Sequence, residues 1–260
     1  MYGCHLLDNH PTDYISVPLK DSHPRLRSPY AEGLFYYTQL DWISKYSQGK
    51  KWNWCDTRPD IIIGFVPNQN FYSLAGATGV FLSLWKEVEG EGSECPYPGS
   101  RKAWVAMSND SSSEMIARQM LHLSLTLPPS LKGEGFNVAD SKSPSPWWGK
   151  WLKICSYFGL KGVAPPKIGG GEPTEVRTYI KKHIGAWNEM ERKHGLRTGI
   201  ADSDLIYKGF EYFLLTQFDF DRQYDMKKMQ MHGMGFVEER STEQAWGGVF
   251  DRMREAKIIP

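Results

Sequence analysis

The sequence predicts an α/β fold whose second part is mainly helical. Helical and strand-like segments alternate from about Gly33 to Val138, an order typical of α/β sheets. The β-branched triplet Ile61–Ile63 is closed by Gly64, which indicates a buried parallel strand ending in a loop. Long helical patterns fill most of the chain after residue 140. These three observations together favour a sheet followed by a helical lobe.

The first half is expected to contain six elements. The apolar residues of the segment Phe35–Tyr46 recur at near-helical spacing and predict a helix. The strand through Ile61–Ile63 follows, then a long apolar helix in NFYSLAGATGVFLSLWKEV and a short strand in AWVAM. The polar cluster Ser108–Ser113 supplies caps for a further helix, and GEGFNVAD reads as a strand.

Helices dominate the second half. The segment SPWWGKWLKICSYFGL is predicted to be a helix with Trp147, Trp151, Ile154 and Phe158 on one side. Helical patterns continue through VRTYIKKHIGAWNEMERKHG and SDLIYKGFEYFLL, and the chain closes with the helix in STEQAWGGVFDRMREAKIIP. We therefore divide the chain at about residue 140 and expect the two parts to interleave.

Composition excludes several classes of partner. The 260 residues, 40% of them hydrophobic, suffice for one large domain or a domain with a lobe. A formal net charge of +1 indicates neither nucleic acid nor a membrane surface as a partner. No stretch approaches the ~18 apolar residues of a membrane span, and the first residues do not resemble a signal peptide. We expect a cytoplasmic protein.

Metal-binding and phosphate-binding motifs are weak or missing. The four cysteines are widely spaced and predict reduced thiols without a metal. The loop Gly169–Pro173 (GGGEP) lacks the spacing of a phosphate-binding loop and predicts a turn. His183 and His194 read as surface residues, and the acids of DFDRQYD as solvated charge. The segment MQMHGMG indicates core filling rather than a pocket wall.

Aromatic residues are abundant, with 10 Trp, 13 Tyr and 12 Phe. Such rings fill cores or line apolar ligand pockets, and for a single ring the core is the commoner place. Tyr36 and Tyr37 stand at the start of the first predicted helix. A tyrosine in that position is either a packing residue or the acid of a reductase, and residue type alone favours packing.

Four stretches, in the same order as in the family, resemble the PRISE family. Its members are the progesterone 5β-reductase and iridoid synthase-like enone reductases of the extended short-chain dehydrogenase/reductase group. This chain has LFYYTQLD where the family has NFYYxLED, and WNWCDTRPDIIIGFVP where the family has WxxxRPxxIxGFxP. FNVADSKSPSPWWGKW and the final MREAKIIP match two further patterns. The resemblance runs from about Tyr2 to Pro260 and is nearest to the fungal branch.

The resemblance implies an NADP-dependent reductase of activated C=C bonds in secondary metabolism, with a small apolar carbonyl compound as substrate. It implies that Tyr36 is the acid, with Tyr37 as second choice. It further implies that Pro59 and Ile62 present backbone groups to the nicotinamide, while Arg58 places their strand.

Departures from the family pattern change what is expected of this chain. Family members begin with a glycine-rich nucleotide loop and a TGxK segment, whereas MYGCHLL resembles the sequence that follows that lysine. Leu34 and Leu40 replace an Asn and a Glu of the tyrosine motif. We therefore expect a partial, N-terminally truncated Rossmann-like doubly wound sheet over 1–140 and a mostly helical substrate lobe over 141–260. The isolated chain should bind NADPH weakly or not at all.

Two other hypotheses remain open. The chain could be a cofactor-free protein kept for its pocket, which binds a small molecule or steers a non-redox isomerisation or cyclisation. It could instead be a truncated gene product without activity. If the first half of the sheet is absent, the strand through Ile61–Ile63 has an unpaired apolar edge, through which homo-oligomers could form.

Overall fold

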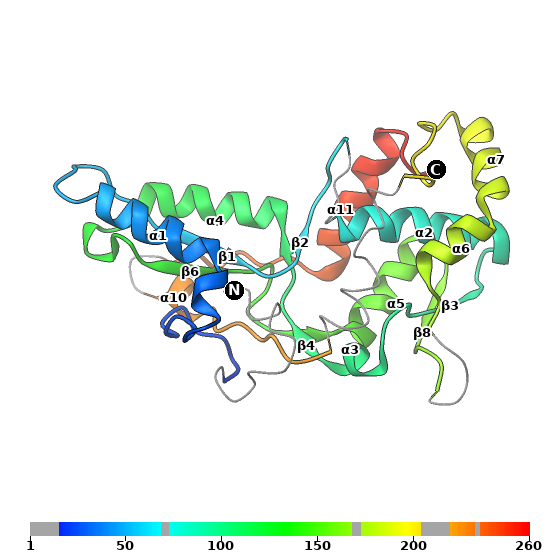
Figure 1. Cartoon of the computed structure of the whole chain (residues 1–260). Coiled ribbons are helices and arrows are strands. Elements are labelled where there is room, and N and C mark those ends of the chain that lie inside the picture. Colours follow the sequence, from blue (N-terminus) through cyan, green and yellow to red (C-terminus); the bar gives the residue numbers. More distant parts are fainter. Residues whose placement is uncertain (1–15, 69–72, 168–172, 204–218, 232–234) are drawn as a thin grey trace.

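The computed structural model describes residues 16–68, 73–167, 173–203, 219–231 and 235–260, and it has two lobes (Figure 1). The sheet lobe, on the left of Figure 1, consists of α1 (Phe35–Tyr46), β1 (Asp56–Pro59), α4 (Ser113–Thr126), β6 (Gly135–Val138) and α10 (Lys227–Gln230). The helical lobe, on the right, consists of α2 (Leu74–Glu89), β3 (Glu94–Pro96), α3 (Arg101–Val105), α5 (Trp147–Tyr157), β8 (Lys161–Val163), α6 (Val176–Lys182), α7 (Ile184–His194) and α11 (Thr242–Glu255).

The strands form short pairs rather than one broad sheet. The remaining strands are β2 (Ile62–Ile63), β4 (Met107–Ser108), β5 (Ser111–Ser112) and β7 (Ser145–Pro146). Among the described residues, β1 pairs with β6, β2 with β5 and β3 with β8, all in parallel, while β4 and β7 are antiparallel. Parallel partners so far apart in sequence need helical crossovers, which α2, α4 and α5 provide. The α/β class with parallel strands is confirmed.

The start of α1 agrees with its apolar periodicity, and polar side chains cap the first turns of α4 and α11. α1 spans Phe35–Tyr46, the range expected from its periodicity. The hydroxyl oxygen of Ser112 accepts a hydrogen bond from the N–H of Met115 and so caps α4. At the start of α11, Ser241 and Gln244 form a reciprocal capping box. Each cap satisfies backbone groups that the first helical turn leaves without a partner.

Two separate hydrophobic cores hold the lobes. The core of the helical lobe buries Trp151, Trp187 and Trp246 completely or nearly so, whereas Trp148 on α5 is about half exposed. The smaller core of the sheet lobe joins Phe136 and Val138 to residues from Tyr224 to Phe236. Because α2 belongs to the first core and α10 to the second, both cores draw on both sides of residue 140. The division into domains 1–140 and 141–260 stays a prediction.

One predicted strand is a helix. In the segment AWVAM, Ala103 and Trp104 lie in α3, and the chain becomes a strand only at Met107. The reason is a cap that the pattern did not reveal: the hydroxyl of Ser100 accepts a hydrogen bond from the N–H of Ala103. An isolated β-prone run is therefore overridden by the polar residue before it.

The predicted strand through Ile61–Ile63 is divided into two. β1 ends at Pro59 and pairs with β6, whereas β2 begins at Ile62 and pairs with β5. Asp60 turns the chain between them, because its N–H donates to Ser111 Oγ and its carboxylate accepts from Arg222. Ile63 is buried, but Ile62 is about half exposed, so the triplet is not a uniformly buried strand.

Other expectations meet mixed outcomes. The acids of DFDRQYD are not merely solvated, because Asp221 Oδ1 accepts from the N–H of Met107 and the neighbouring Arg222 is buried. Met229 fills the core of the sheet lobe as expected.

Residues 168–172, with most of GGGEP, lie outside the described residues, as do residues 204–218. Within the described part, no helix combines the length and apolarity needed to cross a bilayer.

Candidate functional site

Tyr37 is the buried member of the tyrosine pair. Only 5% of it is exposed, and its hydroxyl oxygen accepts a hydrogen bond of 2.9 Å from the N–H of Leu26. The guanidinium of Arg25 lies 4.9 Å from the centre of the Tyr37 ring, and the same guanidinium pairs with Asp41. Tyr37 therefore fastens the loop before α1 to the helix.

Tyr36 is placed differently. Its side chain is 52% exposed, and its ring lies 4.1 Å from the ring of Phe35. No described residue makes a hydrogen bond with its hydroxyl. Successive helical residues lie about 100° apart, so the two tyrosines cannot present their hydroxyls to the same atom. Of the two predicted acids, Tyr36 is the one available to an outside molecule.

A groove of about 490 Å³ separates α1 from β1. Its lining is almost entirely apolar and comes from α1 and from the chain that leads into β1; the lining residues are Thr38, Gln39, Leu40, Trp42, Ile43, Trp54, Cys55 and Asp56. Its volume lies in the range of about 300–1,000 Å³ typical of ligand pockets. The groove brings residues 38–43 of α1 opposite Trp54, Cys55 and Asp56, whereas Tyr36, Arg58 and Pro59 are not among its lining residues.

Arg58 holds the loop of residues 16–25 against β1. Its guanidinium donates to Asp56 at 2.5 Å and to the carbonyl of Asp21 at 2.9 Å. Burial raises the pKa of Asp56 and lowers the pKa of Arg58, so desolvation outweighs the attraction within this ion pair. Gly135 on β6 makes room, since a Cβ there would lie 1.9 Å from Arg58 Cζ.

Pro59 and Ile62 stand on either side of the turn at Asp60. Pro59 is the last residue of β1 and is partly buried, while Ile62 opens β2 and is 49% exposed. The structure thus brings Arg58 and Pro59 together on β1 and sets Ile62 on the next strand. Their proposed role at a nicotinamide stays a prediction.

A polar cluster at the carboxyl ends of β1 and β6 was not among the predicted site residues. Ser111 Oγ donates to the carbonyl of Val138 and accepts from the N–H of Asp60. Both the N–H and the hydroxyl of Ser112 donate to Asp140 Oδ1, at 2.9 and 2.5 Å. Ligands of open α/β sheets bind beyond the carboxyl ends of the strands, so this carboxyl-edge cluster lies at the expected place.

Two buried ion pairs flank the carboxyl-edge cluster. Arg222 Nε lies 3.1 Å from Asp60 Oδ2, with 2% and 3% of the side chains exposed. Lys150 Nζ lies 2.6 Å from Asp110 Oδ1 and also donates to Ser108 Oγ. Buried charges need such partners, because an unpaired charge away from water costs several kcal/mol. These pairs fix the geometry of the region between the lobes.

Asp140 is the most perturbed acid of the cluster. Burial raises its pKa to about 6, against the lowering effect of the Ser112 hydrogen bonds, and the nearby Asp110 raises it further. Its Oδ2 atom is buried and has no hydrogen-bond partner in the described part of the chain. A cavity of about 30 Å³ beside it is roomy enough for one water molecule.

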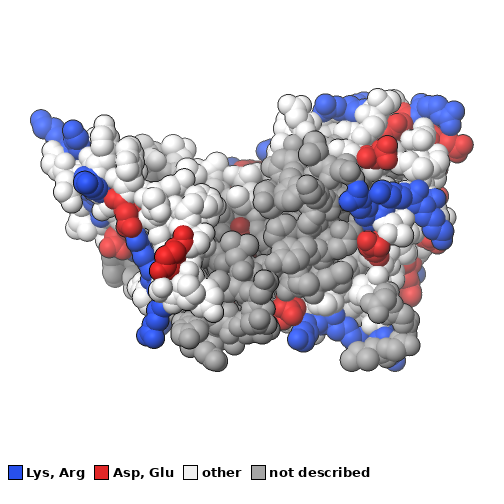
Figure 2. All heavy atoms as spheres, in the orientation of Figure 1, with Lys and Arg blue, Asp and Glu red and all other residues white. Residues whose placement is uncertain are grey.

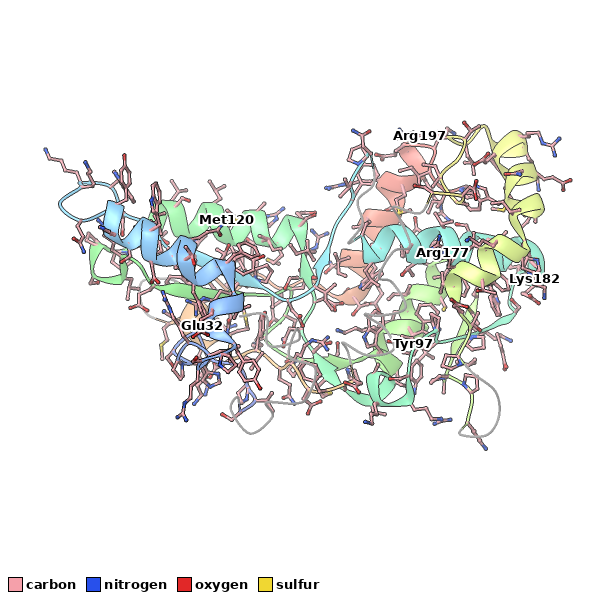
Figure 3. The ribbon with its side chains drawn as sticks, in the orientation of Figure 1. Glu32, Tyr97, Met120, Arg177, Lys182 and Arg197 are labelled. Carbon is pink, nitrogen blue, oxygen red and sulfur yellow. The ribbon has the colours of Figure 1, made fainter. Side chains whose placement is uncertain are left out.

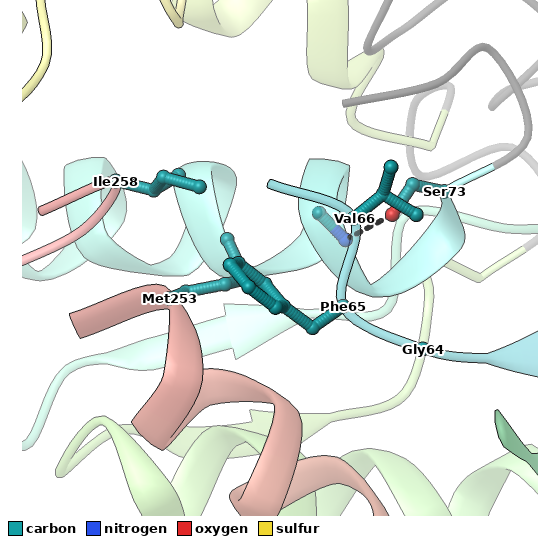
Figure 4. Close-up of a pocket in the computed structure, with 7 residues that line it drawn as sticks. Gly64, Phe65, Val66, Ser73, Met253 and Ile258 are labelled. Atoms are coloured by element: carbon teal, nitrogen blue, oxygen red, sulfur yellow. Dashed lines mark hydrogen bonds between the residues drawn. The ribbon is translucent and has the colours of Figure 1, made fainter. Parts of the chain in front are cut away.

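The loop after β2 offers no comparable space. Sequence position alone had made IIIGFVPNQNF a candidate site. The cavity beside Gly64, Phe65 and Val66 holds only about 10 Å³, and Figure 4 shows Met253 and Ile258 closing it. Ser73 Oγ beside it already accepts from the N–H of Gly76. That cavity is therefore too small for a ligand, and residues 69–72 of the same loop lie outside the described residues.

The described residues do not fit the phosphates of a nicotinamide dinucleotide. Such phosphates need helix N-terminal N–H groups without an acidic neighbour. At α4, the helix that starts at the carboxyl-edge cluster, the N–H of Ser112 is bound by the Asp140 carboxylate. At α2 the Ser73 side chain caps the helix itself.

The sequence does contain short signals for the residues of the carboxyl-edge cluster. The run SNDSSS ends in the cap of α4, and Asp140 comes directly after the strand GFNV. Polar residues just after predicted strands mark a carboxyl edge when the strands are parallel. The partner Arg222 lies 162 residues from Asp60 and carries no local signal.

Comparisons with known proteins agree with this architecture. Curated relatives include the short chain dehydrogenase ausT of Aspergillus calidoustus, 31% identical over 262 residues that cover 100% of this chain and 61% of that protein. The short chain dehydrogenase sirQ of Leptosphaeria maculans is 32% identical over 94% of this chain and 60% of its own length. A 3-oxo-Delta(4,5)-steroid 5-beta-reductase of Arabidopsis thaliana is 26% identical over 91% of this chain and 59% of that protein. The chain spans about three fifths of the length of these relatives.

Similarity to solved structures supports the fold. The structure of RMD from Pseudomonas aeruginosa complexed with NADPH superposes with a TM-score of 0.51 at 11% identity, covering 92% of this chain and 60% of RMD. The family model described as a PRISE-like Rossmann-fold domain matches residues 1–260. The chain therefore belongs to the PRISE family of Rossmann-fold proteins, among relatives that are short-chain dehydrogenases.

Proposed function

We propose that this chain supplies the acid and the substrate surface of a nicotinamide-dependent reductase of activated C=C bonds. The substrates would be enones of small apolar molecules. Family membership and the relative named a steroid 5-beta-reductase support the class of reaction. The observation that carries the proposal is Tyr36, a half-exposed tyrosine in the first turn of α1.

The chemistry requires one well-placed donor. Reduction of an enone adds a hydride to the β-carbon, and negative charge then develops on the carbonyl oxygen. A phenolic O–H aimed at that oxygen stabilises the charge by a hydrogen bond that strengthens in the transition state. Tyr36 is our first choice, because the hydroxyl of Tyr37 is buried and bonded to Leu26.

The hydride source is proposed from the family and not from the described residues. NADP is the cofactor that a short-chain dehydrogenase of this family implies, but the described helix starts at the sheet offer no phosphate cradle. We expect the isolated 260-residue chain to bind NADPH weakly or not at all. Titration calorimetry tests this, and an affinity in the micromolar range would contradict it.

Replacing the tyrosines tests the acid. In an assay of NADPH oxidation with a cyclic enone, Tyr36→Phe should lower kcat by about two to three orders of magnitude, the scale of one lost oxyanion donor. KM should change little, because the bond matters mainly as the enolate forms. Tyr37→Phe is the matched control and should cost less. If the chain alone shows no turnover, the assay adds a separately produced nucleotide-binding half of a relative.

The outcomes are distinct. Unchanged turnover in both variants would mean that the tyrosines are packing residues. A larger loss in Tyr37→Phe would keep the reaction and exchange the two roles.

A second function is favoured by the groove itself. An apolar groove of about 490 Å³ beside α1 has the size of a small-molecule pocket and suits a cofactor-free binding protein or isomerase. Conversion of an enone to an isomer or cyclic product without any nicotinamide, followed by mass spectrometry and NMR, would favour this function over the reductase.

A further inference from the structure

The loop between β6 and α5 contains two Ser-Pro dipeptides. Ser143–Pro144 and Ser145–Pro146 follow Lys142 in the stretch SKSPSP. A proline disfavours the helical conformation of the residue before it and so favours an extended one there. It also lacks a backbone N–H. A serine in this context matches the peptides of proline-directed protein kinases, because their active sites accept an extended chain with proline directly after the acceptor serine.

The two serines differ in accessibility. Ser145 is partly buried and lies in β7, where it pairs with Ser108 of β4. Ser143 is exposed, as is Lys142 before it. The N–H of Ser143 donates to Ser141 Oγ at 3.1 Å, and β7 beyond it is two residues long. Few bonds therefore have to open before an enzyme can bind this segment, and Ser143 is the serine that it reaches first.

Ser143 lies beside a cationic side chain from another segment. It lines the cavity of about 30 Å³ together with Arg240, Asp110 and Asp140. The cavity has room for one water molecule, so a phosphate on Ser143 would lie at its rim and not inside it. Arg240 is the positively charged residue of that lining, and a guanidinium binds two phosphate oxygens at once. Arg240 is therefore the group that a phosphate on Ser143 should bind.

Arg240 already has a partner, which the phosphate would have to displace. Its guanidinium pairs with the Glu114 carboxylate and donates to the carbonyl of Gln244. Glu114 lies in the first turn of α4, in the sheet lobe, whereas Arg240 directly precedes the cap of α11, in the helical lobe (Figure 1). The ion pair therefore joins the lobes. A phosphate carries a charge of about −1.5 to −2 at neutral pH, so it should compete with the single charge of Glu114.

Acidic groups near the loop limit how the phosphate can lie. Asp110 and Asp140 line the same cavity, and Glu239 accepts from the N–H of Lys142. On the face that Figure 2 shows, basic and acidic side chains are interspersed over both lobes. The position of the phosphate is therefore decided by repulsion from the two aspartates and attraction to Arg240, and not by a broad basic surface.

We propose that Ser143 is a phosphorylation site of proline-directed protein kinases and that its phosphate competes with Glu114 for Arg240. In the transfer, Ser143 Oγ forms a bond to the γ-phosphorus of MgATP, and the bond from that phosphorus to the leaving oxygen of ADP breaks. The proton of the hydroxyl passes to the catalytic aspartate of the kinase. The modification depends neither on Tyr36 nor on the proposed reductase reaction.

Kinase assays test the site. The full chain is incubated with MgATP and, separately, with a purified cyclin-dependent kinase and a purified mitogen-activated kinase. Every variant carries Ser28→Ala, which removes another exposed serine that precedes a proline. Peptide mass spectrometry then locates the phosphate. We expect it on Ser143, we expect its loss in Ser143→Ala and in Pro144→Ala, and we expect its retention in the matched control Ser145→Ala.

Phosphorus NMR tests the contact with Arg240. The second ionisation of a phosphoserine has a pKa of about 6, and a neighbouring guanidinium lowers that pKa. The midpoint of the phosphorus titration should therefore lie below about 6 in the phosphorylated chain and return towards it in Arg240→Gln. It should fall further in Glu114→Gln, where Arg240 has lost its competing partner. Arg118 also pairs with Glu114 but does not line the cavity, so Arg118→Gln should change the midpoint far less.

Three results would overturn the proposal. Absence of phosphate from Ser143 with both kinases, or phosphate on Ser145 in its place, would mean that this serine is not the acceptor. Phosphate on Ser143 that persists in Pro144→Ala would exclude the proline-directed class of kinase. A titration midpoint that Arg240→Gln leaves unchanged would mean that the phosphate does not bind Arg240.

Discussion

The two lobes differ in how they treat their aromatic side chains. The helical lobe buries Trp151, Trp187 and Trp246 almost completely. In the sheet lobe, Trp42 is 66% exposed and Tyr46 is 56% exposed. Figure 3 shows a similar contrast on α4, where Met120 points outward and is 49% exposed. One lobe uses its apolar residues as a core, and the other presents many of them to solvent.

The difference shows which aromatic side chains stabilise this chain by being buried. Apolar burial contributes about 25 cal/mol per Å², so the rings of the helical lobe stabilise it without outside help. The exposed rings on α1 contribute little to this chain alone and become useful only when something covers them. The buried rings therefore stabilise the helical lobe, whereas the rings on α1 leave apolar surface exposed to solvent.

The largest expected effect compares two tryptophans, one from each lobe. Trp151→Ala should lower the free energy of unfolding by at least about 3–5 kcal/mol, because it opens a cavity and leaves the Cys95 carbonyl without its 2.9 Å donor. Trp42→Ala should change it by less than about 0.5 kcal/mol. Urea denaturation followed by circular dichroism measures both. Similar losses in the two variants would end the distinction between the lobes.

A smaller effect is expected from the lysines of α5. Lys150→Met removes the ion-pair partner of the Asp110 carboxylate, which is 13% exposed and still accepts from Trp246 Nε1, so it should cost about 2–3 kcal/mol, at or below the range for breaking a fully buried pair. Lys153 on the same helix makes an exposed pair with Glu243, so Lys153→Met should cost at most about 1 kcal/mol. The same denaturation experiment applies. A change near zero in the free energy of unfolding of Lys150→Met would show that the surroundings of residue 150 relax around a neutral side chain.

The smallest expected effect is on the pH dependence of the free energy of unfolding, which tests Asp140 in the region between the lobes. The pKa of Asp140 in the fold is about 6, above the unfolded value of about 4, so the folded state binds this proton more tightly. The stability that protonation adds is therefore present at low pH and is lost as the pH rises from about 4 to about 6. Asp140→Asn should remove up to about 3 kcal/mol of this dependence.

Asp21 supplies the control for that titration. Its pKa is also raised to about 6 by burial, but it lies in the loop held by Arg58. Asp21→Asn should remove a similar part of the pH dependence, and the double variant should remove both parts. Unfolding curves collected at a series of pH values between about 4 and 7 separate the two. An unchanged slope in Asp140→Asn would place the titrating group elsewhere.

The candidate site was only partly predictable. The tyrosine motif identified α1 and its start, since helical spacing is a local property. It did not distinguish the environments of the two hydroxyls, because the burial of Tyr37 depends on Leu26 and Arg25 from a loop without a regular pattern. The carboxyl-edge cluster was missed for the same reason. Asp60 and Arg222 meet only after the chain has crossed between the lobes.

The sequence by itself determined the α/β class, the range of α1, the cap of α4 and membership of the PRISE family. These depend on spacing and on residues within a few positions of each other, which the chain order shows directly. Tertiary structure alone decided that the predicted strand would be split at Asp60, before Ile61–Ile63, and that Tyr37 would be buried while Tyr36 faces solvent. Each of these depends on partners far away in sequence, because burial and hydrogen bonding are settled by what packs against a residue and not by its neighbours along the chain.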